Sequence, residues 1–563
     1  MCQSKADGGK RCASWRARHE VTPGTGTATR PGTGMTTWVC AKCQTAGVRG
    51  GRPGHRCPAP NLVPLTPATR IVLAAIESAG GHPIVVGGSV RDALIADGGP
   101  FTPKDIDIEV YGANTTSLAR ALRRVGRVDD VGESFAVLKV VVDGEDFDVA
   151  LPREDSKVAA GHRGFDVKVD HTLDEVAAFG RRDFTINAMG WDPTTGELVD
   201  PYGGTADLKA GILRHTTAAF REDPLRVLRG VQFAGRFGFT LAPETVTECR
   251  SLTGSFKELP TERVWGEWSK IATKAPWPSI ALDALQDTGW EVHFPELAAI
   301  RGVRQSKSWH PEGTVDVHTG MAADKAAEIA VRDGLSEQDR LVVVLGALTH
   351  DFGKATHSWP IAGTNEVTSN GHAKAGGPMA EAFLTRIGAP VRVREHVATI
   401  VVEHMSHATT AGVTNQAVRR LMRRLDGNGT GPSLAQWARV VEADAGGRGA
   451  ASKPSPATAW LEVADKLEAR PSPSILRGEH LMAAGLRPGP AFSPIMAAAI
   501  SAQDDGLFDD EAGAVSWLGT FLNQSDPQRR ASAGMAGPEI EVPPAAAPRA
   551  PVRETVTSRT LTR

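Results

Sequence analysis

The sequence predicts an α+β protein, with a mixed sheet and helices in its N-terminal part and a mostly helical remainder. Short apolar runs alternate with helical spacing up to about residue 151, and apolar residues recur with a helical period from about residue 216 onward. The 563 residues exceed what one hydrophobic core usually holds, so several domains are expected.

Composition and charge place the chain among soluble globular proteins, with 41% hydrophobic and 23% charged residues. No run of about 18 apolar residues is present, which argues against a transmembrane helix. The first ten residues lack the apolar core of a secretory signal. We therefore expect a cytoplasmic protein without a membrane partner. The net charge of −2 does not exclude RNA binding, because local fields matter more than the sum.

Turn residues divide the first α/β segment into short elements. The expected helices cover residues 69–80 and 89–97, and the expected strands cover residues 82–88, 105–112, 134–144 and 145–151. The dipeptide Asp143-Gly144 joins the last two strands and is typical of a two-residue hairpin turn.

A glycine turn follows the first strand and opens the second helix. Gly88 lets the backbone approach a phosphate, and the helix N-terminus presents free N–H groups to an anion. We expect Ser89 to cap the helix and bind phosphate, and Arg91 to reach the same anion. Taken alone, this pattern also fits an ordinary tight turn.

Acidic residues alternate with isoleucines in the second strand. Asp105 and Asp107 project from one face, because side chains two residues apart in a strand share a face. Such a pair repels unless a cation lies between its members, and Mg²⁺ suits that role. Taken alone, the pair fits a solvated strand face better. Asp148 is the expected third carboxylate of a two-metal site, and Asp146 is the competing choice.

Several segments together resemble one enzyme family. GGSVRDAL (87–94) and DIDIEVYG (105–112) resemble the head of the DNA-polymerase-β-type nucleotidyltransferases. RRDFTINAM (181–189), DPYGGTADL (200–208) and EDPLRVLR (222–229) resemble successive motifs of bacterial tRNA CCA-adding enzymes and poly(A) polymerases. The resemblance covers roughly residues 81–525.

This resemblance implies a nucleotidyltransferase that transfers nucleotides from CTP and ATP to the 3′ end of tRNA. It assigns nucleotide binding to Gly88 and Arg91 and Mg²⁺ binding to Asp105 and Asp107. The remaining assignments are triphosphate and ribose contacts for Arg182 and Asp183, base selection for Asp223 and Arg226, and a further nucleotide contact for Arg229.

One position departs from the family pattern. Gln232 stands where relatives usually carry an arginine, three residues after Arg229. The resemblance therefore implies that one phosphate contact is missing or is supplied from elsewhere.

The helical half carries a second candidate site. His318, His350, Asp351 and Asp444 follow the order of the metal ligands in HD-domain phosphohydrolases, a domain also found in the gamma-proteobacterial CCA-adding enzymes. His372 and His404 are expected as extra ligands or phosphate contacts, and His357 and His407 as ordinary core or capping histidines. The metal is an unspecified divalent ion, and hydrolytic activity of this domain is left open.

The first 60 residues are basic and hold five of the six cysteines. Cys40, Cys43, His55 and Cys57 are ligands of the kind that tetrahedral Zn²⁺ takes, and a flexible tail with reduced thiols is the alternative. Cys249 fits a buried position in a helix.

The motifs and linkers predict six parts: a Cys-rich arm (1–60), a polymerase-β-type nucleotidyltransferase head (61–215), a helical neck (216–305), an HD domain (306–450), a C-terminal arm (451–525) and a disordered tail (526–563). Addition or repair of the tRNA CCA end is the leading functional hypothesis. The alternatives are a poly(A) polymerase, an HD phosphohydrolase with an accessory head, and an RNA-binding module centred on the arm.

Overall fold

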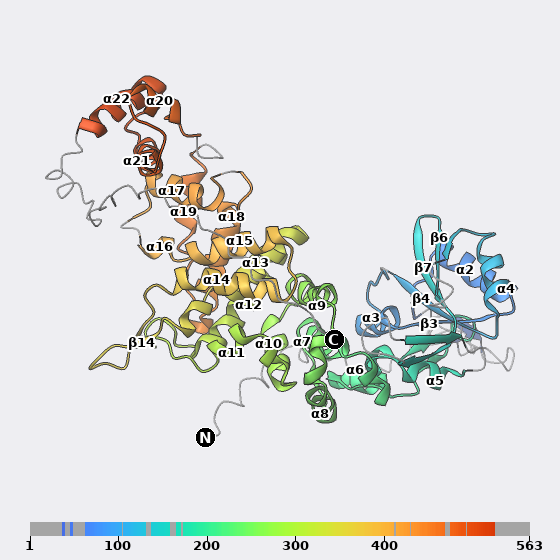
Figure 1. Cartoon of the computed structure of the whole chain (residues 1–563). Coiled ribbons are helices and arrows are strands. Elements are labelled where there is room, and N and C mark those ends of the chain that lie inside the picture. Colours follow the sequence, from blue (N-terminus) through green and yellow to red (C-terminus); the bar gives the residue numbers. More distant parts are fainter. Residues whose placement is uncertain are drawn as a thin grey trace, which may run out of the picture. The chain divides into compact units, whose positions relative to one another are not determined.

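The computed structural model (Figure 1) consists of two compact units, which divide between Pro471 and Ser472 and are described separately. No helix in the described part of the chain is long and apolar enough to cross a membrane. The described residues are 37–39, 46–48, 62–103, 105–130, 137–157, 165–169, 173–409, 412–427, 429–467, 473–490 and 492–523.

The head of unit 1 is built on a seven-stranded mixed sheet with the order β11-β10-β3-β4-β7-β6-β5. Strand β4 pairs antiparallel with β3 and parallel with β7, which confirms the predicted mixed sheet. The strands are β3 (His82–Val86), β4 (Ile106–Tyr111), β5 (Arg127–Asp130), β6 (Val137–Val142), β7 (Glu145–Ala150), β10 (Gly190–Trp191) and β11 (Leu198–Val199).

Both faces of this sheet are covered. Ile106 and Ile108 of β4 pack in the same core as α2 (Pro67–Ser78) and α4 (Thr115–Leu122). Ile84 and Val86 of β3 face the other side, where they pack with Phe179 of α5 (Glu175–Gly180). Burial on both faces explains why β3 reads as a continuous apolar run.

The hairpin between β6 and β7 has the predicted two-residue turn. Val142 pairs with Glu145, and the intervening Asp143 and Gly144 have φ values of 51° and 83°. Two positive φ angles are what a type I′ turn requires, so the Asp-Gly prediction is confirmed.

The rest of unit 1 is mainly helical, as predicted. Its core is continuous with that of the head and extends to Trp460. The head also contains α3 (Gly88–Ala96) and α6 (Gly204–Ala210). The helices after the head are α7 (Leu225–Phe237), α8 (Pro243–Ser251), α9 (Thr261–Lys274), α10 (Pro278–Asp287), α11 (Pro295–Ile300), α12 (Val315–Arg332), α13 (Glu337–Thr349), α14 (His372–Arg386), α15 (Val391–Glu403), α16 (Ser406–Thr409), α17 (Asn415–Asp426), α18 (Leu434–Gly446) and α19 (Thr458–Ala464).

Short strand pairs complete unit 1. They are β1 (Thr37–Val39) with β2 (Ala46–Val48), β8 (Arg153–Lys157) with β9 (Phe165–Val169), β12 (Ile212–Leu213) with β13 (Thr240–Leu241), and β14 (Trp359–Pro360) with β15 (Val367–Thr368). The predicted zinc ligands Cys40, Cys43, His55 and Cys57 lie outside the described residues, as does the tail from residue 526. Helix α19, placed by the expected boundary at 451 in the C-terminal arm, packs on α17 and α18.

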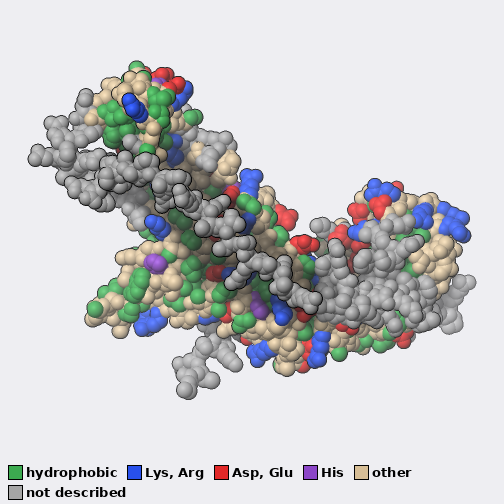
Figure 2. Space-filling model, viewed as in Figure 1, with side chains coloured by type: hydrophobic (Ala, Val, Ile, Leu, Met, Phe, Trp, Pro, Cys, Tyr) green, Lys and Arg blue, Asp and Glu red, His purple; other side chains and the backbone are tan. Residues whose placement is uncertain are grey.

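Unit 2 contains three helices in its described part: α20 (Gly478–Ala483), α21 (Phe492–Asp504) and α22 (Glu511–Asn523). Leu481 of α20, Ile495 of α21 and Leu518 of α22 lie in their common core. Figure 2 shows hydrophobic side chains on the surface of this unit, and Leu507, between α21 and α22, is 67% exposed.

Candidate functional site

A cavity of about 550 Å³ lies between the head and the first neck helices, and we call it the head cavity. Residues of α3, β4, α7 and α9 line it together with the segment 181–187. Its basic side chains are Arg91, Arg181, Arg182, Arg226, Arg229, Arg236, Arg263, Lys270 and Lys274, and its carboxylates are Asp107, Asp183 and Asp223. The excess of cations favours an anionic ligand.

The glycine turn forms one wall of the head cavity. Gly87 has a φ of 74°, and a Cβ atom there would lie 3.2 Å from Nη1 of Arg182 and 3.5 Å from Oδ2 of Asp107. The positive φ angle therefore favours glycine at this position, and the added Cβ atom would also crowd Arg182. The capping role predicted for Ser89 is wrong, because Gly87 is the N-cap and the buried Ser89 hydroxyl donates back to the Val86 carbonyl instead.

Arg91 is held rigidly at the start of α3. Its guanidinium donates to Asp92 at 2.7 Å and to the Asn187 side chain at 2.6 Å. It also lies over the rings of Phe233 and Phe237 of α7, 5.5 and 4.7 Å from their centroids. This side chain thus joins the head to the neck beside the cavity.

The acidic strand places one of its predicted ligands in the head cavity. Asp107 lines the cavity, and Asp148 is its direct register partner on the neighbouring strand. Asp105 lies just before β4 and is exposed. Burial raises the pKa of Asp107, Arg182 lowers it, and the carboxylates of Asp148 and Asp105 raise it further. The carboxylates of Asp148 and Asp105 thus act electrostatically on Asp107.

Glu109 is a functional candidate that the sequence analysis did not single out. It is fully buried two residues after Asp107, and its carboxylate accepts from Arg182 at 2.9 Å. Arg181 lies 3.6 Å from its other oxygen. Glu109 thus positions both arginines of the 181–189 motif. Its strand spacing from Asp107 was the available signal, since the two share a face.

Asp183 occupies the centre of a buried network. It accepts from the Phe184 backbone N–H and from Asn187, and its other oxygen accepts from Arg229 at 2.8 Å. Burial opposes ionisation of Asp183, but Arg229 and the hydrogen bond from Asn187 lower its pKa overall. Asp183 therefore orients Arg229 toward the cavity that both residues line.

Asp223 and Arg226 both line the head cavity, but they do not pair with each other in the structure. The Arg226 guanidinium donates to the backbone carbonyls of Ala219 and Arg181. Asp223 accepts two hydrogen bonds from Arg263 of α9, at 3.2 and 2.8 Å. Arg263 was missed by the sequence analysis, because its partner lies 40 residues away in the chain.

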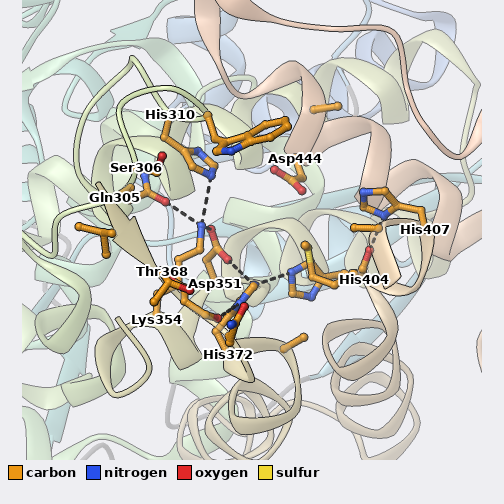
Figure 3. A pocket seen from close by; sticks show the side chains of 18 of the residues that line it. Gln305, Ser306, His310, Asp351, Lys354, Thr368, His372, His404, His407 and Asp444 are labelled. Atoms are coloured by element: carbon orange, nitrogen blue, oxygen red, sulfur yellow. Dashed lines mark hydrogen bonds and ion pairs between the residues drawn. The ribbon is translucent and has the colours of Figure 1, made fainter. Parts of the chain in front are cut away.

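The second site lies among the helices of the HD region. A cavity of about 940 Å³ reaches Asp351, His372, His404 and Asp444 (Figure 3). Two neighbouring groups of side chains lie here, and within each group the ligand atoms are all within 4.8 Å of one another. We call them together the HD cluster: His318, His350 and Asp444, and Asp351, His372 and His404.

Backbone contacts orient three histidines of the HD cluster. Nδ1 of His350, His372 and His404 lies 2.6–2.7 Å from a main-chain carbonyl, which can only accept, so Nδ1 carries the proton. Their Nε2 atoms then present lone pairs inward. The Nε2 atoms of His372 and His404 lie 3.2 Å apart, and Nε2 of His350 has no hydrogen-bond partner among the described residues. Two acceptors facing each other fit a bound cation.

Charge in the HD cluster is partly balanced by protein groups. Burial and the neighbouring His350 lower the pKa of His404 to about 3, which keeps this ring neutral. Lys354 lies 2.7 Å from Oδ2 of Asp351 and donates to Gln305. Glu312, which was not predicted, lies 2.7 Å from Nδ1 of His318.

Known proteins match both parts of unit 1. Family models match at residues 84–214 (poly A polymerase head domain), 238–301 (probable RNA and SrmB-binding site of polymerase A) and 315–470 (HD domain). The "multifunctional CCA protein" of Xanthomonas campestris pv. campestris is 37% identical over 373 residues, which are 65% of this chain and 85% of the relative. The chain belongs to the multifunctional CCA protein family.

Further comparisons agree with this membership. The protein of the same name from Xylella fastidiosa is 35% identical over 373 residues, covering 65% of this chain and 83% of the relative. A crystal structure of the Bacillus stearothermophilus CCA-adding enzyme in complex with CTP has a TM-score of 0.53 and 19% identity, covering 82% of this chain and 99% of that chain. The likeness to this solved structure is one of fold, and it confirms the predicted α+β class.

In this member of the multifunctional CCA family, the structure brings most of the predicted site residues together. Gly88, Arg91, Asp107, Arg182, Asp183, Asp223, Arg226 and Arg229 all line the head cavity. Asp148 adjoins it through its register with Asp107, whereas Ser89 faces the backbone of its own turn. His407 lines the cavity of about 940 Å³ in the HD region, and its Nδ1 contacts the His404 carbonyl. His357 does not line that cavity. Domains of these families generally use divalent metals.

Proposed function

We propose that the chain adds or repairs the 3′-terminal CCA of tRNA, with CTP and ATP as nucleotide donors. One observation carries this proposal: the head cavity joins a glycine turn, a buried carboxylate and a basic wall in a member of the multifunctional CCA protein family. An anionic triphosphate suits the basic wall, and carboxylates are the groups that a metal-assisted phosphoryl transfer uses. A cytoplasmic location and the six-part domain organisation belong to the same proposal.

The chain's own residues position the reactants. Arg182 and Arg229, held by Glu109 and Asp183, present guanidinium groups to the triphosphate. Asp223 and Arg226 face the base, with an acceptor and a two-pronged donor that suit the edge of cytosine. Because Arg226 and Asp223 are tied to separate partners, each can reorient independently when adenine follows cytosine.

The carboxylates fit Mg²⁺, which takes oxygen ligands and substrate phosphates. Asp105 and Asp107 would hold it, with Asp148 as the third carboxylate, and the repulsion that adds to the effect of burial on the pKa of Asp107 would then be relieved. Bound Mg²⁺ supplies activation of the RNA 3′-hydroxyl and neutralisation of the triphosphate. The 3′-oxygen forms a bond to the α-phosphorus, and pyrophosphate leaves.

Three transcripts of one tRNA test this proposal: one ends before CCA, one after C and one after CC. Each is incubated with Mg²⁺ and with CTP, ATP or both, beside an unrelated RNA. Growth to CCA followed by a stop, on tRNA only, is expected. The double variant Asp105→Ala/Asp107→Ala should abolish it. Long A tails on every RNA would instead identify a poly(A) polymerase.

We also propose that the HD region is a metal-dependent phosphohydrolase. The supporting observation is the buried HD cluster, whose His372 and His404 lone pairs face each other. The test uses p-nitrophenyl phosphate and bis-p-nitrophenyl phosphate with EDTA-treated protein and added Mg²⁺, Mn²⁺ or Ni²⁺. Hydrolysis should need metal, disappear in Asp351→Ala and persist in Asp107→Ala. No hydrolysis with any metal would contradict the proposal. Zinc binding by the Cys-rich arm stays a prediction.

A further inference from the structure

Gln232 is an unusual residue of the head cavity. Its side chain is 1% exposed, and its amide nitrogen has no hydrogen-bond partner in the described part of the chain. The residue nevertheless lines the cavity. A buried amide without a partner is disfavoured unless something else supplies an acceptor, so a ligand is the natural partner for this group.

Helix α7 places Gln232 within a stripe of cations. Arg226, Arg229 and Arg236 come from the same helix and line the same cavity, and Gln232 lies between the last two. Each arginine already has a protein partner: backbone carbonyls for Arg226, Asp183 for Arg229, and Asp92, 3.5 Å away, for Arg236. Gln232 is thus the neutral polar residue among the guanidinium groups that α7 presents to the cavity.

The contacts of α7 show which end of the cavity Gln232 serves. Phe233 and Phe237 lie against Arg91, and Arg236 reaches Asp92, so this part of α7 packs beside α3. Helix α3 opens at the Gly87-Gly88 turn, whose N-terminal N–H groups suit phosphate. Asp223, at the base end, precedes α7, whereas Gln232 lies seven residues after the first residue of the helix, Leu225, about 10 Å along its axis at 1.5 Å per residue. Gln232 therefore belongs to the phosphate end.

We propose that the Gln232 amide donates a hydrogen bond to the part of the nucleoside triphosphate that leaves as pyrophosphate. This inference rests on the proposed nucleotidyl transfer. A neutral amide binds phosphate oxygen more weakly than a guanidinium in the same place, because a charge-assisted hydrogen bond is stronger. The residue makes no proton transfer, and it holds pyrophosphate loosely enough to favour release.

Three variants of the full chain test the proposal, with inorganic pyrophosphate and Mg²⁺ as the calorimetric probe. Gln232→Met, which keeps the length of the side chain, should weaken pyrophosphate binding and raise KM for CTP and ATP alike by roughly 10-fold. Gln232→Arg should tighten pyrophosphate binding and slow turnover. Because the amide nitrogen of Gln232 has no hydrogen-bond partner in the described part of the free protein, Gln232→Met should not lower the Tm.

Gln436→Met is the matched control. Gln436 is also buried, but its amide is engaged with Ser433 and Asp339, so this variant should lower Tm and leave KM unchanged. Unchanged pyrophosphate affinity in both Gln232 variants would overturn the proposal, and so would a changed CTP-to-ATP preference alone, which would place Gln232 at the base. Wild-type protein that binds pyrophosphate but extends no tRNA would contradict only the proposed function.

Discussion

The head cavity and the HD cluster are both buried polar sites of unit 1, but their charges are arranged in opposite ways. Guanidinium groups dominate the head cavity, and carboxylates such as Asp183 and Glu109 hold them in place. Histidine lone pairs and carboxylates dominate the HD cluster, with Lys354 as a nearby cation. The first arrangement is prepared for an anionic ligand and the second for a metal cation.

A substitution in one site should therefore abolish the activity of that site and leave the activity of the other unchanged. This prediction has the largest expected effect. Asp107→Asn removes a carboxylate of the head, so nucleotide addition to tRNA should fall by on the order of 10³-fold. Hydrolysis of p-nitrophenyl phosphate should stay at the wild-type rate, and Asp351→Asn should show the reverse pattern. Loss of both activities in one variant would show that the sites are coupled.

Charge balance inside the head predicts the next largest effect. Glu109→Gln leaves Arg181 and Arg182 without their buried counter-charge, so the free energy of unfolding should fall by about 3 kcal/mol. Urea denaturation measures this change. Glu197→Gln, on an exposed turn, is the control and should be neutral. An unchanged midpoint for Glu109→Gln would mean that the arginines are held by other groups.

The corresponding change in the HD cluster should act on metal affinity. Glu312 lies against Nδ1 of His318, so Glu312→Gln should weaken divalent metal binding by roughly 10- to 100-fold. Competition with a metal-sensitive dye reports the affinity. Nucleotide addition by the same variant should be unchanged. Wild-type metal affinity would exclude Glu312 as a positioning residue.

The smallest effect concerns acid stability. Asp183 has a folded pKa below its usual value, so its ionised form adds stability that is present above its unfolded pKa and is lost as pH falls through the folded value. Asp183→Asn should remove this part of the acid dependence, which shows as a shallower loss of Tm below about pH 4. An acid limb identical to that of the wild type would contradict the assignment.

Local patterns explain why much of the fold was predictable. Ile106, Ile108 and Val110 of β4 bury the predicted apolar face, and Asp143-Gly144 has the two positive φ angles that its turn needs. These features depend on residues that are neighbours in the sequence. For the same reason, Asp107 and the glycine turn could be singled out from the sequence. The cap assigned to Ser89 failed because the helix begins one residue earlier, with Gly87 as its N-cap.

By itself, the sequence determined the order of the main elements, the face that β4 buries and the types of residue available to each site, because periodicity and turn chemistry act over a few residues. Only the tertiary structure decided which side chains pair with one another. Asp223 meets Arg263, Glu109 meets Arg182 and His318 meets Asp444 across 40, 73 and 126 residues of chain. Ion pairing and metal binding depend on distances of a few ångströms, which are set only when separate elements pack together.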